Sequence, residues 1–309
     1  MDSNLHHWKN QEQSFLRRLR IWLDLLDPLS LIAGDAEIQK AHTLLGSGEN
    51  VNEKDVTLSL SSVHADSGAN LPLIYRPPAL LPMSLPLVAG SLIPHIRIRH
   101  AAFWQFMLQS YFAGFNSANR NSSSEKNEKK THSTKHLLIA GTVVAATCAG
   151  VLPQFLLSQT GIITATVHPF VRSVLPIPLS AALAYINVSF VRSDETETGI
   201  QVFDSSGNPV GLSEAAGEKA VRETALSRAA LFGTTGAVPF VLSSLLKRTR
   251  FALRNSPLVG PLSGALVLFL TIPVSFSLFP QLGTIRREDV EDELQAAAYD
   301  GQLYYHRGL

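Results

Sequence analysis

Long runs without a charged side chain alternate with short charged segments along this chain of 309 residues. A helix that crosses a bilayer needs about 20 mostly apolar residues, because the hydrocarbon core is about 30 Å thick and each helical residue rises about 1.5 Å. Six windows without Lys, Arg, Asp or Glu reach or nearly reach that length: residues 77–96, 100–119, 137–171, 173–191, 229–246 and 255–285. The pattern therefore predicts a helical membrane protein that crosses the bilayer several times.

The alternative is a soluble helical protein with unusually apolar core helices, which the mean hydropathy of +0.13 permits. Apolar stretches in buried core helices are usually only about 10–14 residues long. The charged residues also concentrate between the windows instead of forming the polar stripe of an amphipathic core helix. They gather in residues 1–76, 120–135, 192–228, 247–254 and 286–309. This segregation favours the membrane protein.

The first window is rich in proline, and each proline inside a regular helix would cost about 3 kcal/mol. Its prolines are Pro77, Pro78, Pro82, Pro86 and Pro94. We therefore expect a broken or re-entrant passage at the membrane surface there. The other windows predict about five spans, at residues 100–119, 137–157, 172–191, 228–246 and 258–280. The basic loops 120–135 and 247–254 then fall on opposite faces, so the lysine and arginine bias does not orient the bundle.

The segments between the windows predict extramembrane structure. Residues 1–99 are expected to hold N-terminal extramembrane or interfacial helices and the Pro-rich passage. An apolar stripe at helical spacing opens this region and ends at Asp27-Pro28; it consists of Phe15, Leu19, Trp22 and Leu26. Two placements stay open for the stripe, in the plane of the lipid headgroups or against the protein's own bundle. Asp35 and Asn52 are the expected N-caps of two further short helices.

Residues 100–280 are expected to form the bundle, interrupted by an ordered loop at 192–227. Within that loop, residues 199–208 alternate apolar and polar side chains and then turn at Asp, Ser and Gly, which is typical of a β-hairpin. Ser213 is placed to cap a helix that continues into the membrane. Residues 281–309 form a C-terminal tail whose acidic run suits a solvated helix start. The fold class is therefore all-α: a polytopic membrane bundle of about five spans with N-terminal surface helices and a small extramembrane β-hairpin.

Composition and motifs limit the kinds of binding site and reaction that we expect of this chain. The chain has 26 basic and 25 acidic side chains, which gives no net field to favour nucleic acid. One cysteine, Cys148, excludes an intrachain disulfide or a four-cysteine zinc site. His132 and His136 have the spacing of a metal pair, but no acid or cysteine accompanies them at matching spacing, so we expect no metal. No phosphate loop, dinucleotide fingerprint or nucleophile elbow is present, and we expect neither a cofactor nor an enzymatic activity.

Four amides are the candidate polar site inside the bundle: Gln105, Gln109, Asn116 and Asn187. The first three follow one another at steps of four and seven residues, which puts them on one helical face. Two interpretations stay open. They line a substrate path, or they form interhelical hydrogen bonds that hold the bundle, each worth about 0.6 kcal/mol on average.

Several motifs together resemble the sideroflexin family over nearly the whole length of the chain. They are His64-Ala65-Asp66-Ser67-Gly68, Phe103-Trp104-Gln105, the hairpin from Gly199 to Ser213, Phe279-Pro280-Gln281 and the ending from Tyr305 to Leu309. The positions that these motifs single out are His64, Asp66, Gly68, Asp204, Gly207, Asn208, Pro280 and Gln281. Two further runs, Val151 to Phe155 and Lys219 to Thr224, are similar to one branch of that family in particular.

The resemblance implies a multi-pass protein of the mitochondrial inner membrane, in contact with its lipid. Transporting members carry intramembrane asparagines where this chain has Leu108, Phe112, Gly150 and Ala184, which removes hydrogen-bonding groups from any substrate path. The branch implies a factor that acts with complex I assembly factors and bears on iron–sulfur and iron homeostasis, without transporting serine. The family as a whole implies the alternative, an active carrier of a small neutral amino acid.

Overall fold

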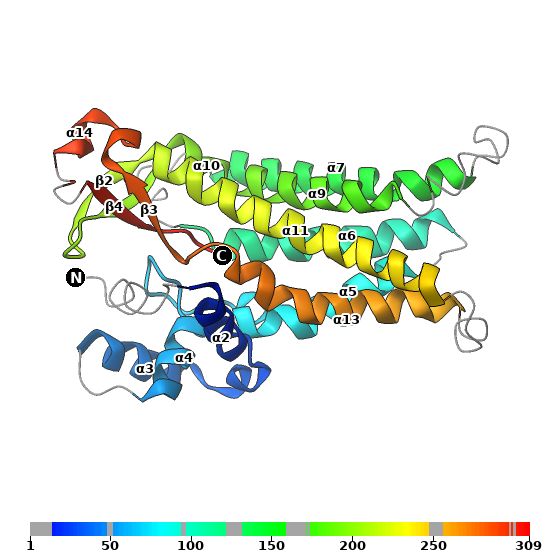
Figure 1. Cartoon of the computed structure of the whole chain (residues 1–309), viewed down its shortest axis with the longest axis horizontal. Coiled ribbons are helices and arrows are strands. Elements are labelled where there is room, and N and C mark those ends of the chain that lie inside the picture. Colours follow the sequence, from blue (N-terminus) through cyan, green and yellow to red (C-terminus); the bar gives the residue numbers. More distant parts are fainter. Residues whose placement is uncertain are drawn as a thin grey trace.

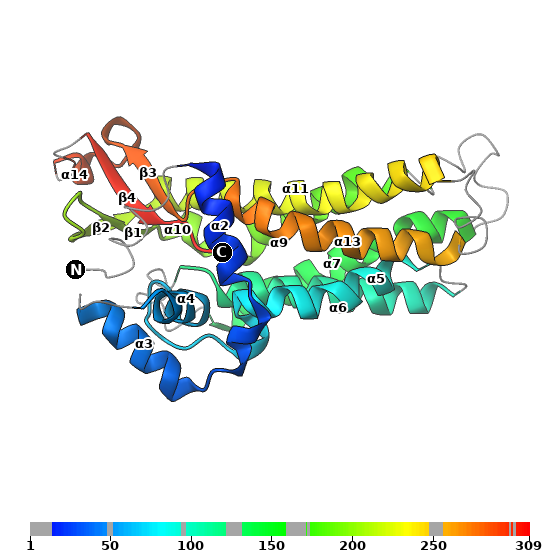
Figure 2. The ribbon, with the colours of Figure 1, turned by 60° about the horizontal axis from the view of Figure 1, so that its bottom comes forward.

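A bundle of long helices with a small sheet at one end makes up the fold (Figure 1). The computed structural model describes residues 14–47, 52–93, 97–121, 132–158, 171, 174–246, 256–296, 298 and 301–309. The helices α5, α6, α7, α9, α11 and α13 lie side by side, and the N-terminal helices α2, α3 and α4 lie beside the end that carries the sheet (Figures 1 and 2). The fold is therefore all-α with a small sheet, as the apolar windows predict.

Each predicted span coincides with a helix. These helices are α6 (Ile98–Ala118), α7 (His132–Ser158), α9 (Pro176–Val191), the second half of α11 (Glu214–Leu246) and α13 (Ser256–Ser277). Three stretches in the described residues are long and apolar enough to cross a membrane: Lys135–Leu156, Glu214–Leu242 and Val259–Ser277. Shorter apolar helices run over Pro77–Leu92 and Pro176–Val191. α6 has sufficient length at 21 residues, although Arg99 and its two glutamines make it less apolar.

The Pro-rich window holds a continuous short helix instead of a broken one, and a re-entrant passage at the membrane surface stays a prediction. A 3-10 turn, η3 (Pro77–Ala79), leads directly into α5 (Leu80–Leu92), which is a single helix of 13 residues packed against α6 and α13. Pro77 and Pro78 precede the helix, and Pro82 lies in its first turn, where a backbone N–H has no helical acceptor to lose. Pro86 alone lies inside the described helix, and Pro94 falls outside the described residues.

The predicted hairpin is half of a larger sheet. Its strands β1 (Ile200–Phe203) and β2 (Pro209–Ser213) are antiparallel. The C-terminal region adds β3 (Leu282–Arg286) and β4 (Gln302–His306), so that the strand order is β2-β1-β4-β3. Val202 pairs with Tyr305, which joins the 192–227 loop to the 281–309 segment. α10 (Ser193–Glu197) and α14 (Asp292–Gln295) flank the sheet, and Ser213 caps α11 as predicted by accepting from the Ala216 N–H at 3.1 Å.

The apolar stripe of α2 (Phe15–Leu25) packs against the bundle. Trp22 lies with its ring 4.7 Å from that of Phe276 in α13, and Leu26 is buried in the same core cluster. The 3-10 helix η1 (Pro28–Ile32) follows, then α3 (Asp35–Ser47) and α4 (Glu53–Ser62). Asp35 is the first residue of α3 and not its N-cap, because its carboxylate instead pairs with Arg76 at 3.0 Å. Asn52 does hold the N-cap position of α4, without a side-chain hydrogen bond.

Candidate functional site

Two asparagines meet inside the bundle. Asn116 of α6 donates from Nδ2 to Oδ1 of Asn187 on α9 at 3.0 Å, and the two residues are only 1% and 2% exposed. Within the described part of the chain, the remaining oxygen of Asn116 and the remaining amide nitrogen of Asn187 have no hydrogen-bond partner. The pair therefore joins α6 to α9 and leaves one acceptor and one donor group unsatisfied in the interior.

The two glutamines do not join this pair. Gln105 lies against α7, where a Cβ on Gly150 would come within 2.8 Å of its Oε1. Gln109 is half-buried one turn further along α6. Gln105 and the asparagine pair thus lie at two different helix contacts, α6 with α7 and α6 with α9.

Apolar side chains fill the interior positions that border the asparagine pair. Leu108, Phe112 and Ala184 are buried. The Phe112 ring packs edge to face on Phe232 of α11, with a centroid distance of 4.8 Å. Edge-to-face pairs of this kind stabilise a core beyond their buried area. These three positions consequently contribute apolar packing and no polar group to the interior.

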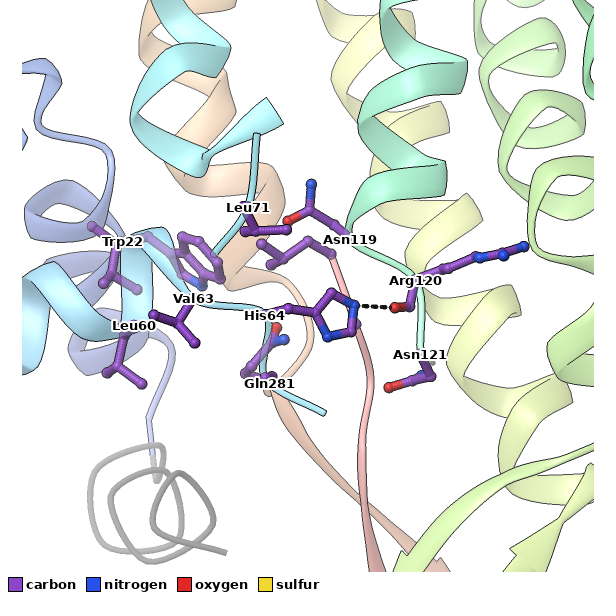
Figure 3. A pocket seen from close by; sticks show the side chains of 13 residues that line it. Trp22, Leu60, Val63, His64, Leu71, Asn119, Arg120, Asn121 and Gln281 are labelled. Atoms are coloured by element: carbon purple, nitrogen blue, oxygen red, sulfur yellow. Dashed lines mark hydrogen bonds between the residues drawn. The ribbon is translucent and has the colours of Figure 1, made fainter. Parts of the chain in front are cut away.

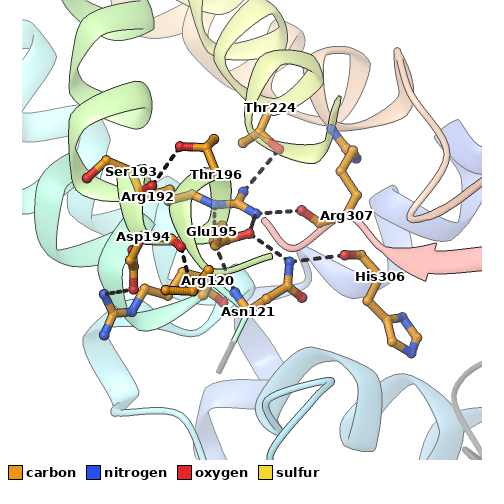
Figure 4. Close-up of polar contacts among 12 residues, drawn as sticks. Arg120, Asn121, Arg192, Ser193, Asp194, Glu195, Thr196, Thr224, His306 and Arg307 are labelled. Atoms are coloured by element: carbon orange, nitrogen blue, oxygen red, sulfur yellow. Dashed lines mark hydrogen bonds and ion pairs between the residues drawn. The ribbon is translucent and has the colours of Figure 1, made fainter. Parts of the chain in front are cut away.

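A dense polar cluster lies at the end of the bundle that faces the sheet (Figure 4). Arg192, at the C-cap of α9, holds both carboxylate oxygens of Glu195 through Nε at 2.6 Å and Nη2 at 2.7 Å. Both side chains are 0% exposed. Arg192 also donates to Thr224 Oγ1 of α11 at 3.1 Å and to the Arg307 carbonyl at 2.7 Å. This arrangement satisfies a buried ion pair, which would otherwise be costly to desolvate.

The end of α6 and the C-terminal segment complete this cluster. Asn121 donates its backbone N–H and its Nδ2 to Glu195, and the same Nδ2 donates to the His306 carbonyl at 3.1 Å. The Leu309 N–H donates to the Asn119 carbonyl at 3.1 Å. Segments distant in sequence therefore meet at one carboxylate.

A second group of charged side chains links α7 to the same end of the bundle. Asp194 Oδ2 accepts from Arg120 at 3.0 Å and from Lys135 at 3.2 Å. The charge pattern along the sequence places Arg192, Asp194 and Glu195 in the loop between two predicted spans and does not predict their burial. The signal that could have indicated their contact is an arginine at the very end of an apolar window, followed three residues later by an acid, since such a pair can bond side by side on one helical turn.

His64 links the N-terminal region to α6 (Figure 3). Its Nδ1 accepts from the backbone N–H groups of Asp66 and Ser67 at 3.3 and 3.2 Å. Nε2 must then carry the proton, and it donates to the Arg120 carbonyl at 2.6 Å. Gly68 closes the turn by donating to the His64 carbonyl at 3.0 Å. These motif positions shape a turn and dock it on the bundle.

A small cavity lies beside His64, with a volume of about 40 Å³, which gives room for a few water molecules. It lies between the N-terminal helices, the end of α6 and the C-terminal segment; its wall includes Trp22, Leu60, His64, Asn119, Gln281 and Leu309 (Figure 3). Gln281 is buried, follows Pro280 after α13, and accepts from the Arg307 N–H at 2.9 Å.

The hairpin motif forms the turn between β1 and β2. Asp204 accepts from the N–H groups of Ser206 and Asn208 at 2.9 and 2.8 Å and from Asn208 Nδ2 at 3.0 Å. The hydrogen bond from the Asn208 side chain, followed by those from the backbone, lowers the pKa of Asp204. Gly207 has a φ of +82°, which a turn of this kind requires. Asp204, Gly207 and Asn208 therefore shape this turn.

Metal ligation finds no support in the described residues, which contain no group of three His, Cys, Asp or Glu able to hold an ion. Cys148 is exposed on α7. His136 lies on the same helix, and the side chain of His132 is outside the described part.

Comparison with known proteins gives matches along the full length. The family model described as sideroflexins matches residues 2–309. Sideroflexin-4 of Danio rerio is 49% identical over 318 residues, with 100% of each chain covered. Sideroflexin-4 of Homo sapiens is 34% identical over 321 residues, covering 100% of this chain and 93% of the relative. Sideroflexin-5 of Homo sapiens is 29% identical over 313 residues, covering 97% and 91%. No solved structure matches.

Proposed function

The chain belongs to the sideroflexin family, and from that premise we propose that it is a mitochondrial inner-membrane protein that helps to assemble respiratory complex I. In this role it acts through binding and not through catalysis, and it does not carry serine. Its effect on iron–sulfur and iron homeostasis follows from that assembly. The multi-pass helical bundle and the similarity to Sideroflexin-4 relatives support the proposal.

The proposal rests mainly on how four positions in the bundle are packed. At the positions where the family resemblance places asparagines in transporting members, this chain packs Leu108, Phe112 and Ala184 into the interior, and Gly150 receives the Gln105 side chain. A path for a polar solute needs groups that replace its hydration, because unsatisfied polar groups are costly in hydrocarbon. A filled apolar interior suits a scaffold better than a carrier.

The extramembrane parts offer surface for partner proteins. The ion pair of Arg192 with Glu195 fixes the sheet and the C-terminal segment to the bundle. On the N-terminal side, Leu29 and Ile32 of η1 are 71% and 82% exposed. These two side chains, one helical turn apart on η1, are apolar surface that a partner protein would cover on binding.

Loss of the protein tests the proposal. Cells without it should lose assembled complex I first, while the other respiratory complexes remain, as measured on native gels of mitochondrial membranes. Wild-type protein should restore complex I. A Leu29→Ser/Ile32→Ser variant of equal abundance should restore it poorly, and the matched control Leu212→Ser on the sheet should restore it well. Intact complex I in the deleted cells would overturn the assembly role.

Carriage of a small neutral amino acid is the second candidate, and the asparagine pair favours it. The unsatisfied oxygen of Asn116 and amide of Asn187 are groups that a polar substrate can bond. Reconstituted protein should then take up labelled serine, alanine or glycine faster than empty liposomes. Gln109→Ala and Asn187→Ala should reduce that uptake. Uptake equal to that of empty liposomes would remove this candidate.

A further inference from the structure

Arg228 is a buried cation without an anionic partner among the described contacts. It lies in α11 immediately before the uncharged run 229–246 and is 2% exposed. Its Cζ lies 4.0 Å from the centroid of the Phe276 ring in α13 and 6.0 Å from that of Phe115 in α6. The aromatic rings attract the guanidinium through their faces, but they cannot accept hydrogen bonds from the N–H groups in its plane.

Among the described residues, the N–H groups in the plane of the guanidinium lack hydrogen-bond acceptors, with one exception. Nη1 makes one long contact of 3.5 Å with Ser227 Oγ. Nε and Nη2, which point along the same edge of the guanidinium, find no acceptor in the part of the chain that the structure describes. A buried donor without a partner is unfavourable, and an unpaired buried charge is more so.

Arg192 shows how the Nε and Nη2 edge of an arginine in this protein binds a carboxylate. Arg192 uses its own Nε and Nη2 to hold the two oxygens of Glu195 at 2.6 and 2.7 Å (Figure 4). Glu195 is thereby engaged, and Asn121 bonds it from the other side. This carboxylate is therefore committed to Arg192 and not to Arg228.

Neighbouring charged side chains also interact with Arg228. The positive charges of Arg307 and Arg192 both act on Arg228. Glu223, the acid nearest in sequence, interacts electrostatically with Arg307, Lys219 and Arg222. Because Glu195 already pairs with Arg192 and Glu223 acts on Arg307, Arg228 is the arginine of this group whose charge has no anion beside it among the described contacts.

We propose that the Nε and Nη2 edge of Arg228 is a binding site for the carboxylate group of a small monocarboxylate. Two coplanar oxygens match the two parallel N–H groups of this edge. A carboxylate brings one negative charge for one unpaired cation, whereas phosphate would bring more charge into a site walled by Phe115 and Phe276. The site goes beyond the assembly role and does not depend on it.

Access to the site requires a local separation of α11 from α13. Ser275 Oγ of α13 donates to the Ser227 carbonyl of α11 at 2.7 Å, directly beside Arg228. This bond joins the two helices at the residue that precedes Arg228. Ligand entry at this point would couple occupancy of Arg228 to the packing of α11 against α13.

The test uses the purified full chain in detergent, with its thermal unfolding followed as sodium acetate or sodium propionate is added, against sodium chloride at equal ionic strength. The wild type should show saturable stabilisation by the carboxylates that chloride does not reproduce. Arg228→Met, which keeps an apolar chain against Phe276, should lose that stabilisation. Arg286→Met, from the exposed pair with Glu288, should keep it.

Arg228→Lys covers the case in which the methionine variant does not fold. Lysine keeps the charge but lacks the paired in-plane donors, so the half-saturating carboxylate concentration should rise about tenfold or more. Three results would overturn the proposal: no carboxylate-specific shift in the wild type, an unchanged shift in either Arg228 variant, or stabilisation by inorganic phosphate without stabilisation by acetate.

Discussion

A single glycine shows how tightly the C-terminal segment is held. Gly308 has a φ of +72°, and a Cβ there would lie 2.8 Å from Arg192 Nη2 and 3.1 Å from the Asn119 carbonyl oxygen. Gly301 has a similar φ of +76° with no atom within 4 Å. Gly301→Ala therefore introduces backbone strain alone, about 1–3 kcal/mol, and Gly308→Ala adds a clash with the ion pair. We expect the unfolding temperature in detergent to fall further for Gly308→Ala; equal falls would contradict it.

The sequence makes a polar residue conspicuous where it stands inside an apolar window and gives little sign of its burial where it borders one. Asn116 and Asn187 stand out as amides in hydrocarbon, and the structure pairs them. Arg192, Glu195 and Arg228 border windows, where a charge usually marks the end of a span. The burial of Arg192 and Glu195 depends on partners such as Asn121 and the Arg307 carbonyl, and no periodicity in a single helix contains that information.

At the scale of elements, a close approach between α10 and α11 depends on one residue. A Cβ on Gly217 would meet the backbone carbonyl of Glu195, so the two helices could not keep their present separation. Gly217→Ala should therefore force α10 from α11 and lower the unfolding temperature. Gly141→Ala is the matched control, because Gly141 is helical with nothing within 4 Å; there alanine should be neutral or stabilise by up to about 1 kcal/mol. A neutral Gly217→Ala would show that the two helices have freedom to separate.

A second contact between elements is the cap of α11, which is supplied by Glu291 from a distant segment. Glu291 Oε1 accepts from the Glu214 and Ala215 N–H groups at the start of α11, at 2.7 and 3.1 Å. Partial burial would raise the pKa of Glu291, but the hydrogen bonds from Ala215, Ser213 and Glu214 lower it overall. The stability from this cap is therefore fully present above the ordinary glutamate pKa of about 4.3 and is lost as the pH falls through the lowered value.

Glu291→Gln should accordingly destabilise the protein by about 0.5–2 kcal/mol at neutral pH. The difference from the wild type should vanish in acid, as followed by unfolding temperatures over a pH series. Glu293→Gln, at an exposed position, should match the wild type throughout. A constant difference at every pH would mean that the carboxylate charge does not make the cap.

At the scale of the whole molecule, the apolar windows predicted the bundle, while the assembly of its extramembrane end escaped prediction. The hairpin at 199–208 is a local pattern and is found in the structure. β3 and β4 have only five residues each. β4 pairs with β1, which lies about a hundred residues earlier in the sequence, and a local pattern does not predict such a pairing. The prolines of 77–96 permit a continuous helix over Leu80–Leu92 for a related reason, since their effect depends on where the helix begins.

Glu195 joins these distant parts, because α6, α9, α10 and the C-terminal segment all bond to it or to its partner Arg192. Glu195→Gln leaves the Arg192 charge buried and unpaired, which should cost about 3–5 kcal/mol. The C-terminal residues should then detach first, because their bonds converge on this pair, and limited proteolysis should cleave them before the bundle. Glu288→Gln removes an exposed pair of the same kind and should change stability by less than about 1 kcal/mol. If both variants resisted proteolysis equally, the cluster would not be what unites the sheet with the membrane helices.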